Sequence, residues 1–340
     1  MDVTYGKKWG LRRLADAQGR FKMVAVDQRP PIEKLVISKK GTCGFADMVA
    51  VKRLLAETLS AHTTAVLVDP NFAYAGAIDM IPAQRGLLLT LEDHRFEDTA
   101  TGRRSFPIRD WTVEKIRKIG GDAVKVLAWY RPDASAEVIR HQQDFVQRIG
   151  DECAKWDIPF IFELLLYPFP ASAAHTTDYV EDVNKHPEMV VQSVQAFADA
   201  KYGVDLFKLE SPIPAGKLAP HGNSAESQDQ QRWFDAVGEA CGGRPWVMLS
   251  AGAGMSEFEN VLRYAYQAGA NGYLAGRAIW WEALQQFPDI ERVRAELNGK
   301  SSAYVQRLNA LTDASATPFN VSPEKQDEIQ EEGDFARLYA

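Results

Sequence analysis

The 340-residue sequence has few cysteines and no long apolar run. Its three cysteines, Cys43, Cys153 and Cys241, are far apart, and their spacing fits neither a disulfide framework nor a zinc site. The longest apolar run, residues 159–169, is interrupted by Glu163, so no membrane-spanning helix is predicted. The first twenty residues contain no apolar segment typical of a secretory signal.

Basic residues are also in the minority, because the formal net charge is -7. No basic run interleaved with aromatic residues is present, which argues against a general nucleic-acid binder. We therefore expect a cytoplasmic protein that has neither nucleic acid nor a membrane as its partner.

Short apolar runs alternate with longer amphipathic ones along most of the chain. The apolar runs are nearly continuous instead of alternating with polar residues, which is typical of parallel strands covered on both faces. The predicted strands are residues 22–28, 64–70, 86–92, 122–130, 158–166, 205–211, 245–252 and 271–276.

Helical patterns fill the gaps, over residues 45–62, 112–120, 135–156 and 186–203 and after a capping box predicted at Ser256–Glu259. Eight strands alternating with helices predict an α/β protein with a (β/α)8 TIM barrel, and a doubly wound open sheet is the alternative. We expect one barrel domain over residues 1–314 and an acidic C-terminal extension over residues 315–340.

Polar side chains interrupt or end most of these strands. In a barrel such residues meet at the carboxyl ends of the strands, where barrel enzymes have their active sites. A single lysine in an apolar run usually has a structural explanation, but that explanation would have to hold at several strands together. The polar residues are Asp27, Gln28, Asp69, Glu92, Lys125, Glu163, Lys208, Glu210, Ser250 and Arg277. Gly252 and Gly276 end the last two strands and are compatible with a bound phosphate.

Lys208 and its neighbours suggest a specific chemistry. A lysine held inside a barrel loses hydration, so its pKa is expected to fall and its amine can attack a ketone to give an iminium. An iminium is an electron sink for carbon–carbon bond cleavage. Glu163, on the strand between those of Lys125 and Lys208, is placed to move protons, and Lys125 could tune Lys208 or hold an oxyanion. A structural ion pair between Lys125 and Glu163 is the alternative.

The last two strands end in segments suited to an anion. "LSAGAGMS" and "LAGRA" offer glycine, free backbone N–H groups and Arg277. Barrel enzymes often bind phosphate with these two loops. Neither segment is a P-loop or a dinucleotide fingerprint, so the sequence indicates neither ATP nor NAD as a cofactor.

Several segments together resemble a known family. They are residues 26–30 ("VDQRP"), 99–133, 157–167, 203–212 ("GVDLFKLESP"), 249–252 ("LSAG") and 268–280. In these segments the chain is similar to the class I tagatose-1,6-bisphosphate aldolase family, which includes the sulfofructose-phosphate aldolases. The likeness runs in order over roughly residues 20 to 310 and is therefore more specific than one short motif.

The resemblance implies a (β/α)8 barrel that forms a lysine Schiff base with no metal and no cofactor. It implies that Lys208 is the Schiff-base lysine, Glu163 the proton-transfer carboxylate and Lys125 its supporting cation. Asp27 and Gln28 would contact substrate hydroxyls. The phosphate of the dihydroxyacetone phosphate half would contact Ser250, Gly252, Gly276 and Arg277.

The sequence departs from this family around the far end of the substrate. The segments 167–185 and 217–231 look unusual. Arg29, Arg131, His175 and His221 are candidates there for binding a second anionic group, either phosphate or sulfonate.

These observations predict a lyase that cleaves a ketose 1-phosphate with a second anionic group into dihydroxyacetone phosphate and a three-carbon aldehyde. Which ketose it uses, and whether it forms a homo-oligomer, stay open. One alternative is a metal-dependent phosphosugar epimerase or isomerase that uses Asp27, Asp69, Glu92 and Glu163, although no histidine is expected at a strand end. A non-catalytic barrel that binds a sugar phosphate is the other alternative.

Overall fold

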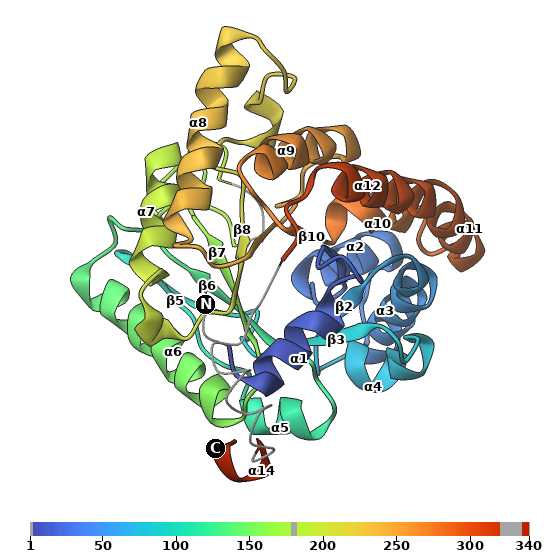
Figure 1. Ribbon diagram of the computed structural model, residues 1–340. Helices are drawn as coiled ribbons and strands as arrows, with labels where there is room; N and C mark the ends of the chain where they lie inside the picture. The colour runs from blue at the N-terminus through green and yellow to red at the C-terminus, as the bar shows by residue number, and fades with distance from the viewer. Residues whose placement is uncertain (1–2, 178–181, 320–334, 340) are drawn as a thin grey trace.

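Eight parallel strands form a closed barrel in the computed structural model, which describes residues 3–177, 182–319 and 335–339 (Figure 1). The strand order is β1-β10-β9-β8-β7-β6-β3-β2, and β1 closes the barrel by pairing with both β10 and β2. The predicted (β/α)8 barrel is confirmed, and the open sheet is excluded by this closure. The strands are β1 (Phe21–Ala25), β2 (Ala65–Val68), β3 (Gly86–Thr90), β6 (Ala123–Trp129), β7 (Phe160–Leu165), β8 (Leu206–Leu209), β9 (Trp246–Met248) and β10 (Gly272–Ala275).

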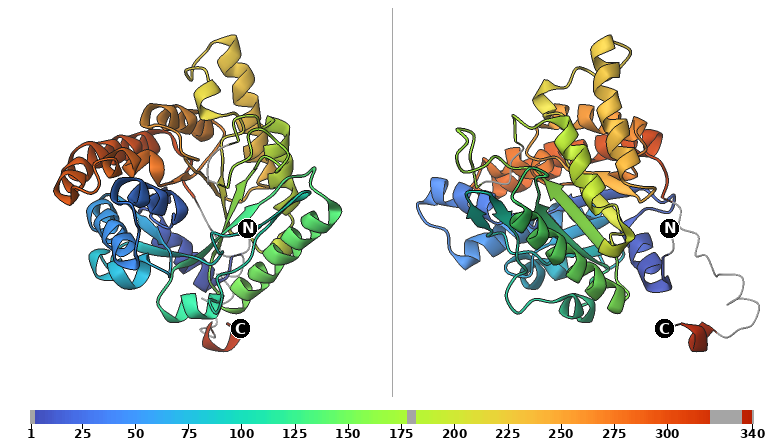
Figure 2. Two further views of the ribbon diagram at one scale, coloured as in Figure 1. Left: turned by 180° about the vertical axis from the view of Figure 1, so that it is seen from behind. Right: turned by 90° about the vertical axis from the view of Figure 1, so that its left-hand side faces the viewer.

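Helices surround the barrel (Figures 1 and 2), and a short hairpin of β4 (Glu97–Thr99) and β5 (Gly102–Arg104) follows β3. The helices of the described residues are α1 (Tyr5–Leu14), α2 (Pro30–Lys40), α3 (Phe45–Leu59), α4 (Ala73–Ala77), α5 (Val113–Lys118), α6 (Ala136–Lys155), α7 (Pro187–Phe197), α8 (Ala225–Ala240), α9 (Met255–Gln267), α10 (Arg277–Leu284), α11 (Ile290–Glu296), α12 (Ser302–Ser315) and α14 (Phe335–Leu338).

The start of α9 differs from the predicted capping box at Ser256–Glu259. The helix begins at Met255, and the Glu257 carboxylate accepts the backbone N–H of Gly254 at 2.9 Å. The prediction was wrong because the turn after β9 brings the chain into helical conformation before Ser256. Glu257 therefore takes the third position of the helix, from which a carboxylate reaches back to the N-cap.

The barrel interior is layered because side chains alternate along each strand. Leu206 lies in the apolar layer at the amino end of the barrel, Phe207 packs outward against the helices, and Lys208 points inward again. The same alternation on β6 and β7 places Lys125 and Glu163 beside Lys208. The apolar layer beneath them contains Phe21, Met23, Ala65, Leu67, Leu88, Ala123, Ile161, Leu206, Val247 and Leu274.

The barrel helices continue to Ser315, the last residue of α12. Most of the extension predicted over residues 315–340 lies outside the described residues. Of its described part, Phe319 packs on Phe21, and Phe335 of α14 contacts Tyr5 of α1.

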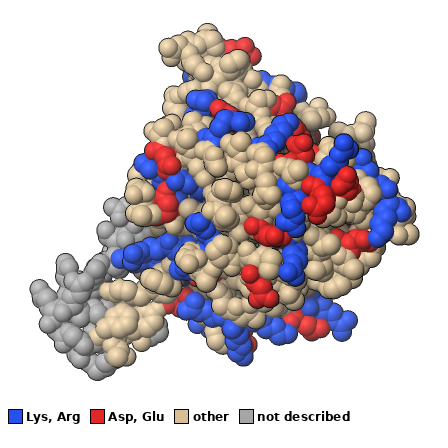
Figure 3. Space-filling model, turned by 90° about the vertical axis from the view of Figure 1, so that its right-hand side faces the viewer, with Lys and Arg blue, Asp and Glu red and all other residues tan. Residues whose placement is uncertain are grey.

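The described residues include no helix that is both long enough and apolar enough to cross a membrane. Basic and acidic side chains are interspersed over the face shown in Figure 3. That face therefore differs from the continuous basic surface on which nucleic-acid binding depends.

Candidate active site

A cavity opens at the carboxyl ends of the strands and contains about 580 Å³, counting the part open to solvent. Every residue to which the family resemblance assigned a role lines it, except Gly252. The predicted residues in the lining are Asp27, Gln28, Arg29, Lys125, Glu163, Lys208, Ser250, Gly276 and Arg277. The strands bring these residues together although Asp27 and Arg277 are 250 positions apart in the sequence.

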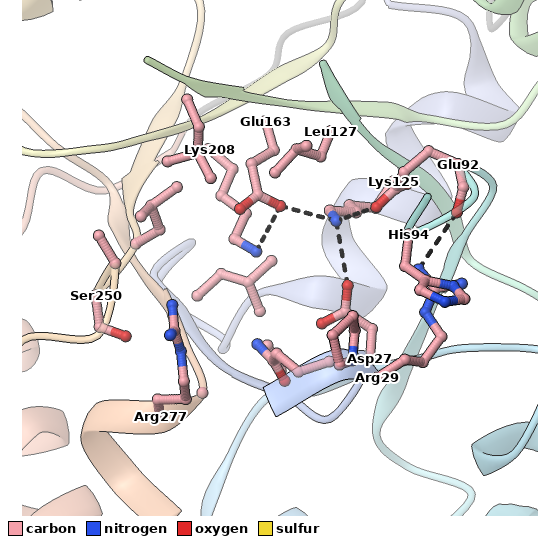
Figure 4. Close-up of a pocket in the computed structure, with 18 residues that line it drawn as sticks. Asp27, Arg29, Glu92, His94, Lys125, Leu127, Glu163, Lys208, Ser250 and Arg277 are labelled. Atoms are coloured by element: carbon pink, nitrogen blue, oxygen red, sulfur yellow. Dashed lines mark hydrogen bonds and ion pairs between the residues drawn. The ribbon is translucent and has the colours of Figure 1, made fainter. Parts of the chain in front are cut away.

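Lys125 is surrounded by three carboxylates. Its Nζ lies 2.5 Å from Glu92 Oε1, 2.8 Å from Glu163 Oε2 and 3.1 Å from Asp27 Oδ2 (Figure 4). Burial alone would lower the pKa of Lys125, but the three negative charges outweigh it and raise this pKa well above its usual value. Lys125 is therefore a permanent cation at neutral pH.

Lys208 shares one of these carboxylates. Its Nζ lies 2.9 Å from Glu163 Oε2, the same oxygen that contacts Lys125. Burial tends to raise the pKa of Glu163, but the two ammonium groups lower it below its usual value. Glu163 is thus an ionised carboxylate between two lysines. The Lys125–Glu163 ion pair foreseen as a structural alternative is present, and it lies in the wall of the cavity.

Three consecutive residues after β1 present polar atoms to the cavity. Asp27 Oδ1, Gln28 Oε1 and Arg29 Nε are buried and have no hydrogen-bond partner among the described residues. Arg29 is oriented by Asn71 Oδ1 and by the backbone carbonyl of Glu92, each 3.3 Å from its guanidinium. Burial opposes ionisation of Asp27, but nearby cations, first Lys125 and then Lys208, lower its pKa to about 2. Buried unpaired polar atoms are rare, so a ligand is the natural partner for these three.

The turn after β9 lies beside Arg277. Ala251 and Gly252 both have left-handed backbone conformations, with φ of 45° and 94°. A Cβ on Gly252 would lie 3.4 Å from the Arg277 guanidinium carbon, which is an ordinary van der Waals contact, so it is the backbone conformation that favours glycine here. Gly252 itself lines a neighbouring hollow that shares Ala251 and Arg277 with the cavity. The predicted contact of Gly252 with the phosphate stays a prediction.

Gly276 allows a second close approach. A Cβ at this position would lie 2.6 Å from Gln28 Nε2 and 2.8 Å from the carbonyl oxygen of Ala25. Any larger residue would displace Gln28 from the cavity wall. Packing therefore requires glycine at position 276, whereas the left-handed backbone favours it at position 252.

The cavity has a cationic group at each end. Ser250 and Arg277 lie on one side in Figure 4, Arg29 and His94 lie on the opposite side, and the lysines and Glu163 lie between them. Charged hydrogen-bond donors at both ends favour an elongated ligand with two anionic groups.

His94 is a cavity residue that the sequence did not predict, and it lies in a loop beyond the end of a strand. It follows β3 and lines the cavity, with Nδ1 3.2 Å from Asp93 Oδ1. Burial and the charge of Arg29 lower the pKa of His94 to about 4, so the ring is neutral at pH 7. Sequence reasoning missed it because it belongs to a loop and no motif marks it.

Three other candidates for a second anionic group do not line the cavity. Arg131 pairs with Asp133, and its guanidinium also donates to the carbonyl of Tyr167. His175 Nε2 lies 2.6 Å from Asp98 Oδ2.

His221 Nε2 lies 2.8 Å from Gln267 Oε1, beside α9. The segment 217–231 around His221 carries the first turns of α8 and contributes no cavity residue. Ion pairs and a contact with a residue of α9 hold these three side chains outside the cavity. The sequence does not reveal these partners.

The carboxylates considered for a metal site have ammonium partners. Asp69 pairs with Lys52 at 2.5 Å, and both side chains are buried, whereas the other three carboxylates surround Lys125. Within residues 3–177, 182–319 and 335–339, no group of three or more His, Cys, Asp or Glu residues is arranged to hold a metal ion. The donor set therefore fits a lysine site better than a metal site.

A (β/α)8 barrel with ionisable side chains gathered at the carboxyl end of its strands defines a barrel enzyme. The sequence model described as "DeoC/LacD family aldolase" matches residues 21–282. The chain therefore belongs to the DeoC/LacD aldolase family, and aldolases are carbon–carbon lyases.

Curated relatives and solved structures agree with this family. The chain is 30% identical over 326 residues to the tagatose 1,6-diphosphate aldolase of Listeria monocytogenes, with 94% of this chain and 95% of the relative covered. It is 29% identical to tagatose 1,6-diphosphate aldolase 1 of Streptococcus mutans, with 93% and 98% covered. An archaeal fructose-1,6-bisphosphate aldolase, whose catalytic lysine is covalently bound to a carbinolamine intermediate, has a similar fold, with a TM-score of 0.51, 18% identity, and 85% and 97% covered.

Proposed function

We propose that this chain is a class I aldolase. It cleaves a ketose 1-phosphate with a second anionic group into dihydroxyacetone phosphate and a three-carbon aldehyde, through an iminium on Lys208. The observation that carries this proposal is the difference between the two buried lysines. Among the described residues, Lys208 pairs with Glu163 alone, whereas Lys125 contacts three carboxylates.

This difference supports Lys208 as the nucleophile. An ammonium group has no lone pair, and three negative charges keep the proton on Lys125. Lys208 has to lose only one partner, and that partner, Glu163, can accept its proton at 2.9 Å. Lys125 remains charged and can stabilise negative charge that develops on a substrate oxygen.

Glu163 can carry protons through the whole reaction. It takes a proton from the Lys208 ammonium, and the neutral amine then attacks the ketone carbon to form a carbinolamine. Glu163 returns the proton to the carbinolamine hydroxyl, which leaves as water and gives the iminium. The carboxylate next takes the proton of the C4 hydroxyl as the C3–C4 bond breaks, the aldehyde leaves, and the bonding electrons form an enamine. Protonation at C3 and addition of water release dihydroxyacetone phosphate and the lysine.

The two ends of the cavity match the two ends of such a substrate. Ser250, Gly276 and Arg277 suit the phosphate next to the ketone, with Gly252 supporting the Arg277 guanidinium from behind. Asp27 Oδ1 and Gln28 Oε1 can accept hydrogen bonds from sugar hydroxyls, and Arg29 can bind the second anion.

The names of the relatives favour tagatose or fructose 1,6-bisphosphate. A 6-sulfofructose 1-phosphate has the same arrangement of two anions and stays in the proposal. Both substrates would need the same spacing between Arg277 and Arg29.

Trapping tests the proposal directly. The protein is incubated with each of the three ketose phosphates and sodium borohydride, and peptides are analysed by mass spectrometry. We expect a reduced adduct on the peptide containing Lys208, together with dihydroxyacetone phosphate in a coupled assay that EDTA does not inhibit. An adduct on Lys125 would reverse the two lysine roles. Absence of an adduct with EDTA-sensitive activity would favour a metal enzyme, and absence of any turnover would favour a binding protein.

A further inference from the structure

Glu92 is a buried carboxylate that the steps above do not use. Only 1% of its surface is exposed, and both carboxylate oxygens are engaged. Oε1 contacts Lys125 Nζ at 2.5 Å, and Oε2 accepts the Thr90 hydroxyl at 2.6 Å. Thr90 is itself fully buried, and its hydroxyl can donate to the Glu92 oxygen. Glu92 is therefore fixed between Thr90 and Lys125.

The position of Lys125 affects Glu163 strongly. Glu163 Oε2 lies within 3 Å of two ammonium groups, at 2.8 and 2.9 Å, and each one stabilises its charged form. A carboxylate held by two uncompensated cations is a weak base. Glu92 and Asp27 lie on the other side of Lys125 and offset its charge (Figure 4).

We propose that Glu92 is a positioning residue, which together with Thr90 draws the Lys125 ammonium toward itself so that Glu163 can accept the proton that Lys208 must lose. This inference rests on the proposed function. The charged groups that face Glu163 are Lys125, Lys208 and Asp27, and those that face Glu92 are Lys125 and, at its backbone carbonyl, Arg29.

A pH profile separates this role from a merely structural one. Removing the negative charge with Glu92→Gln leaves Lys125 uncompensated, so Glu163 becomes a weaker base. We expect turnover to fall roughly tenfold or more and the acid limb of the turnover profile to move down by about one pH unit. Glu92→Asp keeps the charge and should keep the acid limb of the wild type. Glu97→Gln, which removes an exposed carboxylate paired with Arg104, is the surface control.

Thr90→Val provides a second test that does not depend on the folding of Glu92→Gln. Without the hydroxyl donor, Glu92 is held less firmly toward Lys125, so the charge of Lys125 is offset less and Glu163 becomes a weaker base. The two variants are thus expected to move the acid limb in the same direction, and the shift should be smaller for Thr90→Val.

Borohydride trapping of the wild type distinguishes the two proposals. If Lys208 is trapped and neither variant moves the acid limb, the inference about Glu92 is wrong and the aldolase proposal stands. If no adduct forms on Lys208 in the wild type, the proposed function itself is wrong.

Discussion

Glu163 and Lys208 face each other in register on β7 and β8, with Lys208 Nζ 2.9 Å from Glu163 Oε2. The same oxygen lies 2.8 Å from Lys125, which has two further carboxylate partners. One carboxylate oxygen therefore joins a lysine that has one carboxylate partner to a lysine that has three. Because of this asymmetry, we expect replacement of the two lysines to have different effects on the free energy of unfolding.

Replacement of each lysine by methionine should affect stability differently. Lys208→Met leaves Glu163 paired with Lys125, so we expect the free energy of unfolding to be equal to or higher than that of the wild type, because one desolvated charge is gone. Lys125→Met leaves three buried carboxylates without their shared cation and should cost about 3–5 kcal/mol. Urea unfolding of both variants measures the difference. A similar loss in both would show that the two ion pairs are equivalent.

Lys208→Met should also abolish turnover and borohydride trapping, because Lys125, the other lysine among the described residues that line the cavity, is kept protonated by three carboxylates. Mass spectrometry of the borohydride-treated variant is the measurement. Undiminished trapping in this folded variant would move the Schiff base to another lysine.

Glu163→Gln should separate adduct formation from turnover. The amide keeps the shape but cannot shuttle protons, and general acid–base groups contribute about 10²- to 10⁴-fold. We expect turnover to fall within that range, whereas the adduct on Lys208 still accumulates, because water can replace Glu163 in the slower proton transfers of iminium formation but not at the C4 hydroxyl. Stopped assays and trapping on the same samples measure both quantities. Activity within a few-fold of the wild type would show that another group moves the proton.

Arg277→Ala tests the phosphate end of the cavity. A hydrogen bond to a charged group contributes about 1.5–3 kcal/mol, so the Michaelis constant for the phosphorylated ketose should rise by roughly one to two orders of magnitude. Arg232→Ala removes an exposed arginine that pairs with Asp229 and is the matched control. Michaelis constants that are equal in the two folded variants would contradict the assignment.

His94 should make the protein less stable in mild acid. Its pKa is about 4 in the folded state, against an ordinary value of 6.5, so between these two values the unfolded chain binds the proton and the folded protein does not. Stability is therefore lost as the pH falls from about 6.5 to about 4. Urea unfolding across this range should show a shallower loss for His94→Gln than for the wild type.

His221→Gln serves as the control for His94→Gln, since it removes an imidazole that lies beside Gln267 and not in the cavity. Equal slopes for the wild type and His94→Gln would show that His94 does not resist protonation in the folded protein.

The sequence predicted the barrel because its strand signals are local. Buried parallel strands require nearly continuous apolar runs, and a charged residue in such a run is conspicuous. Lys125, Glu163 and Lys208 could therefore be recognised as candidate site residues, because charged residues occur in several such strands together. Their alternation with outward-facing residues such as Phe207 also follows from the two-residue period of a strand.

The loops were much harder to predict. His94, Asn71 and the Glu257 cap lie in segments without a hydrophobic period, and Arg131, His175 and His221 looked like cavity residues until their partners were known. The orientation of a polar side chain in a loop depends on the charged group or backbone carbonyl that packs beside it in the folded protein. That neighbour is usually distant in the chain, as Asp98 is from His175.

By itself, therefore, the sequence determined the closed barrel and the set of charged residues at its mouth, because periodicity and strand-end position are properties of neighbouring residues. Only the tertiary structure decided which lysine carries three carboxylates and which carries one. The two lysines look alike in their strands, and their difference depends on Asp27 and Glu92, which the closure of the barrel brings to Lys125 and not to Lys208. Charges act through space over a few ångströms, so their effect on a neighbour is fixed by packing and cannot be read from the order of residues.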